Sequence, residues 1–326
     1  MTGTFKANTP ANNFLLLLYG FVLKISLFIY TRPPALQSSD GPLYRSFIIW
    51  LSGVFSGSSV VFGFITFILL FVQAIAFNKL VNDQRMFQKP GYLVGMSYLL
   101  ITSLFSEWFS LSAALIVNTI LIWVWVKLCT LHNNGSAKTT IYNLGLGIGA
   151  ACFIYYPSII FTLLFIVGIA ITRPFKLNEW LIGLIGICTP FYFFASWLFL
   201  TGQINTYQMP ALLISRPLFA QYQWAIAAIV AILLSMSLGF FFIQNNMRRQ
   251  IVQTRKSWQL IYLYLLTASV VPFVNASAGF TNWILAAVPA SLLVSSAFYY
   301  PDKKWFPFII HWGMVLISLT IVYFVN

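Results

Sequence analysis

The stretch SSVVFGFITFILLFVQAIAF, residues 58–77, decides the fold of this chain. It contains no charged residue, and as an α-helix it is long enough to cross the roughly 30 Å hydrocarbon core of a bilayer. Similar runs lie on both sides of it. With 60% hydrophobic residues, 7% charged residues and a mean hydropathy of +0.86, the chain lacks the polar surface that a soluble fold of 326 residues requires. We therefore predict an all-α, polytopic transmembrane bundle.

The remaining apolar runs give about eleven predicted spans in one integral membrane domain, residues 1–326. The short runs on either side of Glu107 and Pro157 allow more than one division into spans, and every such division gives a helical bundle. The spans cover residues 13–30, 58–77, 91–105, 108–126, 141–155, 158–172, 180–201, 224–243, 258–275, 281–298 and 306–324.

The basic residues alternate between the gaps that separate these spans. Outside the spans, one set of gaps has only Arg32, Arg45 and Arg216, and Lys24 lies inside the first span. Positive charge is typical of cytoplasmic loops, so this set of gaps is predicted to be external and the other set cytoplasmic. The predicted topology is N-in and C-out, with an odd number of crossings. The other set of gaps carries Lys6, Lys79, Arg85, Lys89, Lys127, Lys138, Arg173, Lys176, Arg248, Arg249, Arg255, Lys256, Lys303 and Lys304.

The net charge of +13 is explained by loops that face anionic membrane lipids. The densest basic segment, residues 247–256, lacks the interleaved aromatic residues of a nucleic-acid platform, so we predict membrane lipids and no nucleic acid as partners. The predicted location is a bacterial inner membrane.

Familiar chemical motifs are scarce. His132 and His311 are far apart, and Cys129, Cys152 and Cys188 have no metal-ligand spacing, so the sequence predicts no metal site built on them and identifies no cofactor.

A glycine pattern lies within one of the predicted helices. Gly145, Gly147 and Gly149 have no preceding strand, which a dinucleotide-binding loop requires. With Gly183 and Gly186, they indicate close helix packing.

Two acids fall on the side of the membrane with few charges. Asp40 lies in the first external loop, residues 31–57, and Glu107 lies in the second. After Asp40, the residues Leu43, Phe47, Trp50, Leu51 and Val54 recur at helical spacing, which predicts an amphipathic helix on the outer membrane surface. Each acid also has a structural interpretation, as a cap that satisfies free amides at a helix N-terminus.

These features resemble the GT-C superfamily of polyprenyl-phosphate-dependent glycosyltransferases. The resemblance rests mainly on residues 1–200: the acid in the first external loop, the surface helix after it, the acid in the next loop, and the stretches 155–157 and 173–181. The chain has a lone Asp40 where many members carry adjacent acids, and within these 326 residues we expect no large external C-terminal domain. It is therefore similar to a small or degenerate member. The whole chain also resembles a polytopic membrane protein family from Bacteroidota, which supplies no function.

The GT-C resemblance implies transfer of a sugar from a polyprenyl-phosphate donor to an acceptor outside the membrane. Such a reaction needs a base for the acceptor proton and positive groups for the leaving phosphate. Asp40 is the candidate base, and Glu107 would orient the acceptor or help to hold a divalent cation. Substrate-binding candidates are Lys24, Arg32, Arg45 and Arg216, although Lys24 could instead extend its ammonium to the membrane interface.

Two other classes remain open. A non-enzymatic scaffold or lipid-handling subunit of an envelope assembly or secretion complex would explain why specific motifs are absent. A secondary transporter would predict internal repeats and polar residues at mid-membrane, which this sequence scarcely provides.

Overall fold

A computed structural model describes residues 2–31, 33–133, 137–207, 212–216, 223–274, 279–301, 303 and 305–324. Arg32 therefore lies outside the described residues. Within them the regular structure is helical, with two isolated β-bridges, Asp40 to Tyr155 and Ile214 to Val274. The predicted all-α class is confirmed.

The helices follow one another with short connections. The α-helices are α1 (Thr2–Phe5), α2 (Ala11–Leu23), α3 (Ser26–Ile29), α4 (Pro42–Val54), α5 (Ser59–Asp83), α6 (Leu93–Ile101), α7 (Ala113–Thr130), α8 (Ala137–Ile154), α9 (Phe161–Thr172), α10 (Leu177–Leu200), α11 (Gln223–Met247), α12 (Val252–Val270), α13 (Ala287–Tyr299) and α14 (Trp305–Phe324). The 3₁₀-helices are η1 (Ser106–Phe109), η2 (Leu131–Asn133), η3 (Tyr156–Ile160), η4 (Val271–Phe273) and η5 (Thr281–Ala286).

All of the predicted apolar runs fall on helices of the structure. Among the described residues, five helices are long and apolar enough to cross a membrane: Ser59–Asp83, Ala113–Thr130, Leu177–Leu200, Trp224–Met247 and Thr281–Tyr299. Several of the others are shorter, and α6 has nine residues, about half of what a span requires. The chain is therefore a multi-pass membrane protein, whereas the eleven crossings and the N-in orientation stay predictions.

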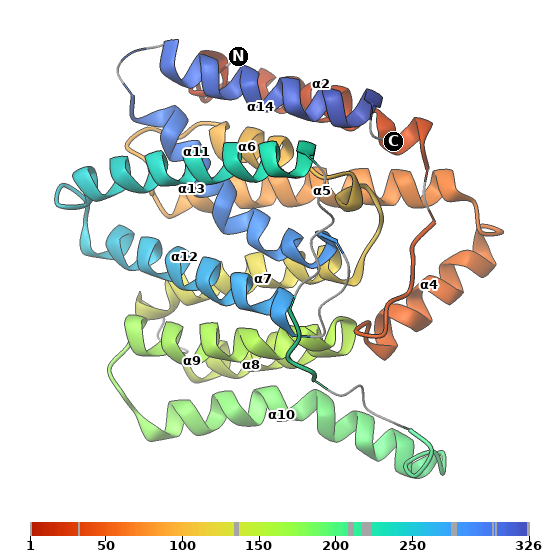
Figure 1. The fold of residues 1–326 in the computed structure, drawn as a ribbon. Helices are drawn as coiled ribbons and strands as arrows, with labels where there is room; N and C mark the ends of the chain where they lie inside the picture. The colour runs from red at the N-terminus through yellow and green to blue at the C-terminus, as the bar shows by residue number, and fades with distance from the viewer. Residues whose placement is uncertain are drawn as a thin grey trace.

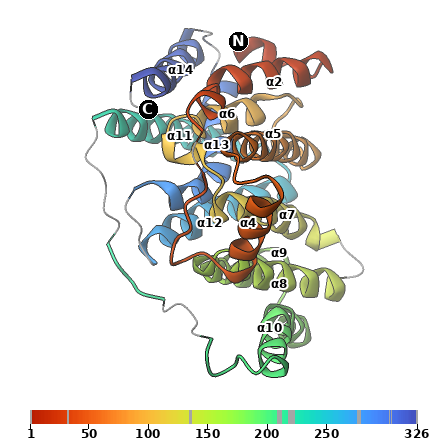
Figure 2. The same ribbon diagram turned by 90° about the vertical axis from the view of Figure 1, so that its right-hand side faces the viewer.

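The helices pack side by side, from α2 and α14 at one edge, through α6, α13, α12 and α7, to α8 and α9, with α10 at the opposite edge (Figures 1 and 2). The core is apolar and aromatic; Trp125, Trp258 and Tyr264 are among its largest fully buried side chains. Helix α4 lies obliquely at one end of the bundle, with the segment before it running along the same end (Figure 1). Residues of this segment form part of the candidate site.

Glycines allow α10 to approach α8 closely. A Cβ atom on Gly145 would lie 2.3 Å from the Gly183 carbonyl oxygen, and one on Gly186 would lie 2.4 Å from the Tyr142 carbonyl oxygen. Gly149 likewise has no room for a side chain beside Ile187. The prediction that these glycines serve close packing is confirmed.

Helix α4 is amphipathic, but the apolar stripe seen in the sequence is mostly its outer face. Leu43, Phe47, Trp50 and Val54 are exposed, as expected for side chains in contact with lipid at a membrane surface. A second stripe, Tyr44, Ile48 and Leu51, is buried, and α4 packs against α8. The Tyr44 hydroxyl donates to the Leu111 carbonyl oxygen at 2.8 Å, which ties α4 to the segment before α7.

Candidate functional site

The main chain around Asp40 is fixed to the end of α8. The Gly41 amide donates to the Ile154 carbonyl oxygen at 2.9 Å, and the Tyr156 amide donates to the Ser39 carbonyl oxygen at 3.1 Å. Only glycine fits at position 41, because a Cβ atom there would lie 2.0 Å from the Phe153 carbonyl oxygen. Two stretches more than a hundred residues apart thus hold Asp40 between them.

The Asp40 side chain is 4% exposed and does not cap α4. The N-cap residue is Gly41, and the Asp40 carboxylate instead accepts a 2.7 Å hydrogen bond from the Gln37 amide. Burial raises the pKa of Asp40 to about 6, against the opposing effects of the Gln37 amide and the Arg45 charge. A carboxyl group with such a pKa can accept or release a proton near neutral pH.

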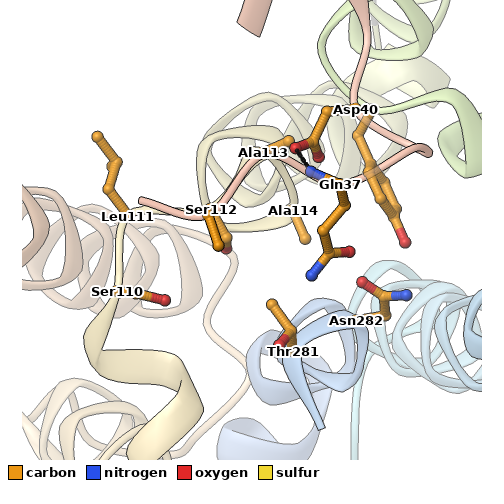
Figure 3. A pocket seen from close by; sticks show the side chains of 11 residues that line it. Gln37, Asp40, Ser110, Leu111, Ser112, Ala113, Ala114, Thr281 and Asn282 are labelled. Carbon is orange, nitrogen blue, oxygen red and sulfur yellow. Dashed lines mark hydrogen bonds between the residues drawn. The ribbon is translucent and has the colours of Figure 1, made fainter. Parts of the chain in front are cut away.

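Asp40 lines a small polar cavity of about 70 Å³ at this end of the bundle. In Figure 3, the side chains of Gln37, Thr281 and Asn282 converge on the same space, with the first turn of α7 on its other side. Among the lining residues, Asp40 alone carries a formal charge. The complete lining is Ala35, Gln37, Asp40, Ser110, Leu111, Ser112, Ala113, Ala114, Tyr155, Thr281 and Asn282.

Glu107 lies in η1 outside this lining. Its carboxylate accepts a hydrogen bond from the Phe280 amide, and Gly279, with φ of +99°, leaves room for the carboxylate beside it. The Trp108 indole reinforces this link by donating to the Phe280 carbonyl oxygen at 2.7 Å. Glu107 is not the cap of α7, because Ser112 occupies that position. It instead holds the segment that leads into Thr281 and Asn282.

The described cations predicted to bind substrate do not line the cavity either. Lys24 is fully buried; its ammonium donates to the Thr102 and Ser103 hydroxyls at 2.9 and 3.1 Å. Arg45 is exposed and donates to the main-chain carbonyl oxygens of Gln37, Ser38 and Asp40, so it supports the loop that carries Asp40. Arg216 is exposed on the segment 212–216.

Several lining residues could not be found from the sequence. Tyr155, Thr281 and Asn282 look like ordinary span-end residues, and Ala113 and Ala114 offer the cavity little beyond their backbone. The only signal was the stretch 155–157, which the GT-C resemblance had marked. Within the described ranges, no group of three His, Cys, Asp or Glu side chains could hold a metal ion.

Together, the fold and its long apolar helices define a polytopic, all-helical membrane protein. Over 94% of its length, the chain is similar to the crystal structure of ArnT from Cupriavidus metallidurans bound to undecaprenyl phosphate, with a TM-score of 0.52 and 12% sequence identity. It spans 62% of the length of that structure. At this identity the likeness concerns the fold alone.

The chain belongs to a family of unknown function, DUF6427, whose model matches residues 40–326. No curated protein matches its sequence.

Proposed function

We propose that this protein is a lipid-linked sugar transferase of GT-C type, with its site on the outer face of a bacterial inner membrane. The observation that carries the proposal is the nearly buried carboxyl group of Asp40, with its raised pKa, in a polar cavity at one end of the bundle. The GT-C-like fold supports a polyprenyl-phosphate sugar as the donor, because the similar ArnT structure holds undecaprenyl phosphate.

In the proposed reaction, Asp40 takes the proton of an acceptor hydroxyl as the oxygen attacks the anomeric carbon of the donor sugar. A new bond forms between that oxygen and the anomeric carbon. The bond from the anomeric carbon to the phosphate oxygen breaks, and its electron pair leaves with the polyprenyl phosphate. The surrounding amides and hydroxyls are of the kind that orient a neutral polyol.

Glu107 has a positioning role in this proposal. By holding the Phe280 amide, its carboxylate sets the start of η5, and η5 brings Thr281 and Asn282 into the cavity. It would thus orient the acceptor without touching it. Arg45 similarly fixes the loop of Asp40, and its exposed guanidinium remains available to a lipid phosphate at the membrane surface.

The test compares wild-type protein with Asp40→Asn in nanodiscs, supplied with short-chain polyprenyl phosphates that carry a hexose or an N-acetylhexosamine. We expect saturable donor binding by native mass spectrometry, and a roughly 10²- to 10⁴-fold loss of donor turnover in Asp40→Asn, because the amide cannot take the acceptor proton.

Asp83→Asn is the matched control, since Asp83 is an exposed acid at the C-terminus of α5. It should retain wild-type turnover. Binding no tighter than that of bulk phospholipid, with no difference between wild type and Asp40→Asn, would contradict the transferase and favour the scaffold.

A further inference from the structure

The helix α7 begins at the wall of the Asp40 cavity. Ser112 caps it, and the Ser112 hydroxyl accepts the Leu115 amide at 3.2 Å. The two amides before Leu115, those of Ala113 and Ala114, have no hydrogen-bond acceptor within the described part of the chain, although both residues are at least 98% buried. Both residues line the cavity. Free amides at a helix N-terminus, together with the helix dipole, favour a negatively charged ligand.

A second, independent feature points to a ligand in the same cavity. The Tyr155 side chain is 1% exposed, lines the cavity, and its hydroxyl makes no hydrogen bond within the described residues. The Ser39 side chain lies beside this hydroxyl without meeting hydrogen-bond geometry, and the Asp40 charge acts on it. A buried hydroxyl without a partner is costly, and native structures usually satisfy such groups with protein, water or ligand atoms.

We propose that the N-terminus of α7 and the Tyr155 hydroxyl form a binding site for a phosphate or a similar oxyanion, in the same cavity as Asp40. Two backbone amides and one hydroxyl supply three donors, a number that suits the oxygens of a phosphate. If the proposed transferase function holds, and this step rests on it, the anion is the phosphate that leaves with the lipid. The chain would then stabilise that charge with a helix terminus, where the sequence had suggested cationic side chains.

The neighbouring carboxyl group predicts how this binding depends on pH. Ionised Asp40 repels an anion, so binding favours protonated Asp40 and the affinity should rise as pH falls through about 6. The titratable groups facing Asp40 are Arg45 and Tyr44 on α4 and Tyr155 at the end of α8. The start of α7 and η5 bring only neutral groups to the lining. Asp40→Asn should therefore bind the anion more tightly at neutral pH, with a flat pH profile.

The experiment is calorimetric titration of the detergent-solubilised full-length protein at pH 5.5 and 7.5. The probes are sodium sulfate, which does not titrate in this range, inorganic phosphate, and geranyl phosphate as a short lipid phosphate. Two variants remove one donor each. Tyr155→Phe deletes the hydroxyl with little change of shape. Ala113→Pro deletes one amide at the first helical position, where proline is tolerated, and the extended backbone of Ser112 suits a following proline.

We expect Tyr155→Phe and Ala113→Pro each to weaken sulfate binding roughly tenfold, as for loss of a hydrogen bond to a charged group. Asp40→Asn should strengthen it several-fold at pH 7.5. Tyr264→Phe is the matched control, because Tyr264 is another buried hydroxyl without a partner among the described residues and lies outside this cavity. Sulfate binding by Tyr264→Phe should equal that of the wild type.

The probes separate the sources of the anion. Binding of sulfate and inorganic phosphate supports a site open to soluble oxyanions, and binding of geranyl phosphate alone, with the same variant pattern, supports a lipid headgroup. No saturable binding of any probe, or equal binding by wild type and Tyr155→Phe, overturns the inference. Anion binding without sugar turnover in any variant would leave this site standing while the transferase fails. Sugar turnover that is lost in Asp40→Asn, together with sulfate binding that Tyr155→Phe does not change, would support the transferase and contradict the anion site.

Discussion

Asp40 gives the clearest consequence at the scale of a single residue. Its pKa is raised by burial, so the folded state binds its proton more tightly than the unfolded state does. The resulting stability is present below about pH 4 and is lost as pH rises through about 6. At neutral pH, the protein therefore keeps a buried carboxylate at the expense of stability, as is common for groups placed for chemistry.

We expect Asp40→Asn to raise the free energy of unfolding at pH 7.5 by roughly 1–3 kcal/mol, because the neutral amide avoids the desolvation of a charge and its oxygen can still accept the Gln37 amide. Thermal unfolding in detergent between pH 4 and pH 8 measures this. The advantage of the variant should shrink towards pH 4. Equal unfolding temperatures at pH 7.5 would contradict the raised pKa.

At the scale of elements, the contact between α8 and α10 depends on glycines that leave the two backbones almost touching. We expect Gly186→Val to separate the helices, because the added side chain meets the Tyr142 carbonyl oxygen of α8. The cost should be about 1–3 kcal/mol, as for overpacked interiors. A lower unfolding temperature in detergent would show it.

Gly313→Val in α14 is the matched control, since a Cβ atom on Gly313 meets nothing within 4 Å. It should leave the unfolding temperature nearly unchanged. Similar losses in both variants would indicate a general effect of valine in place of helical glycine.

The elements themselves could be predicted from the sequence, whereas the site could be predicted only in part. Long apolar runs and helical spacing depend on neighbouring residues, so they indicated the bundle, α4 and the acid Asp40. The partners of Asp40 in space, Tyr155, Thr281 and Asn282, come from distant parts of the chain and carry no local pattern. The free amides at the start of α7 belong to the backbone, which a sequence does not display.

The predicted cations show the same limit. Lys24 and Arg45 were notable for their positive charge on a side of the membrane with few charges. Only the structure reveals that one donates to hydroxyls of residues 102 and 103 and the other to carbonyl oxygens of its own loop.

At the scale of the whole molecule, the distribution of basic residues predicts that α4 lies on the outer, non-cytoplasmic face of the inner membrane. In a Cys188→Ser background, which removes the exposed native cysteine, we expect Ser46→Cys on α4 to react with a membrane-impermeant maleimide in intact cells. Arg255→Cys in the first turn of α12 should react only after permeabilisation, because the charge bias places it in the cytoplasm. The reverse pattern would contradict the N-in orientation.

The composition of the cavity wall also determines when the site can first exist during biosynthesis. Its wall is made of residues 35, 37, 40, 110–114, 155 and 281–282. A ribosome makes these stretches in that order, and helices enter the membrane as they emerge. Under the predicted topology, Asp40 therefore reaches the outer side of the membrane early. The cavity around it is completed only after most of the chain has been translated. A nascent chain that stops before residue 281 would carry the acid without the wall that completes its surroundings.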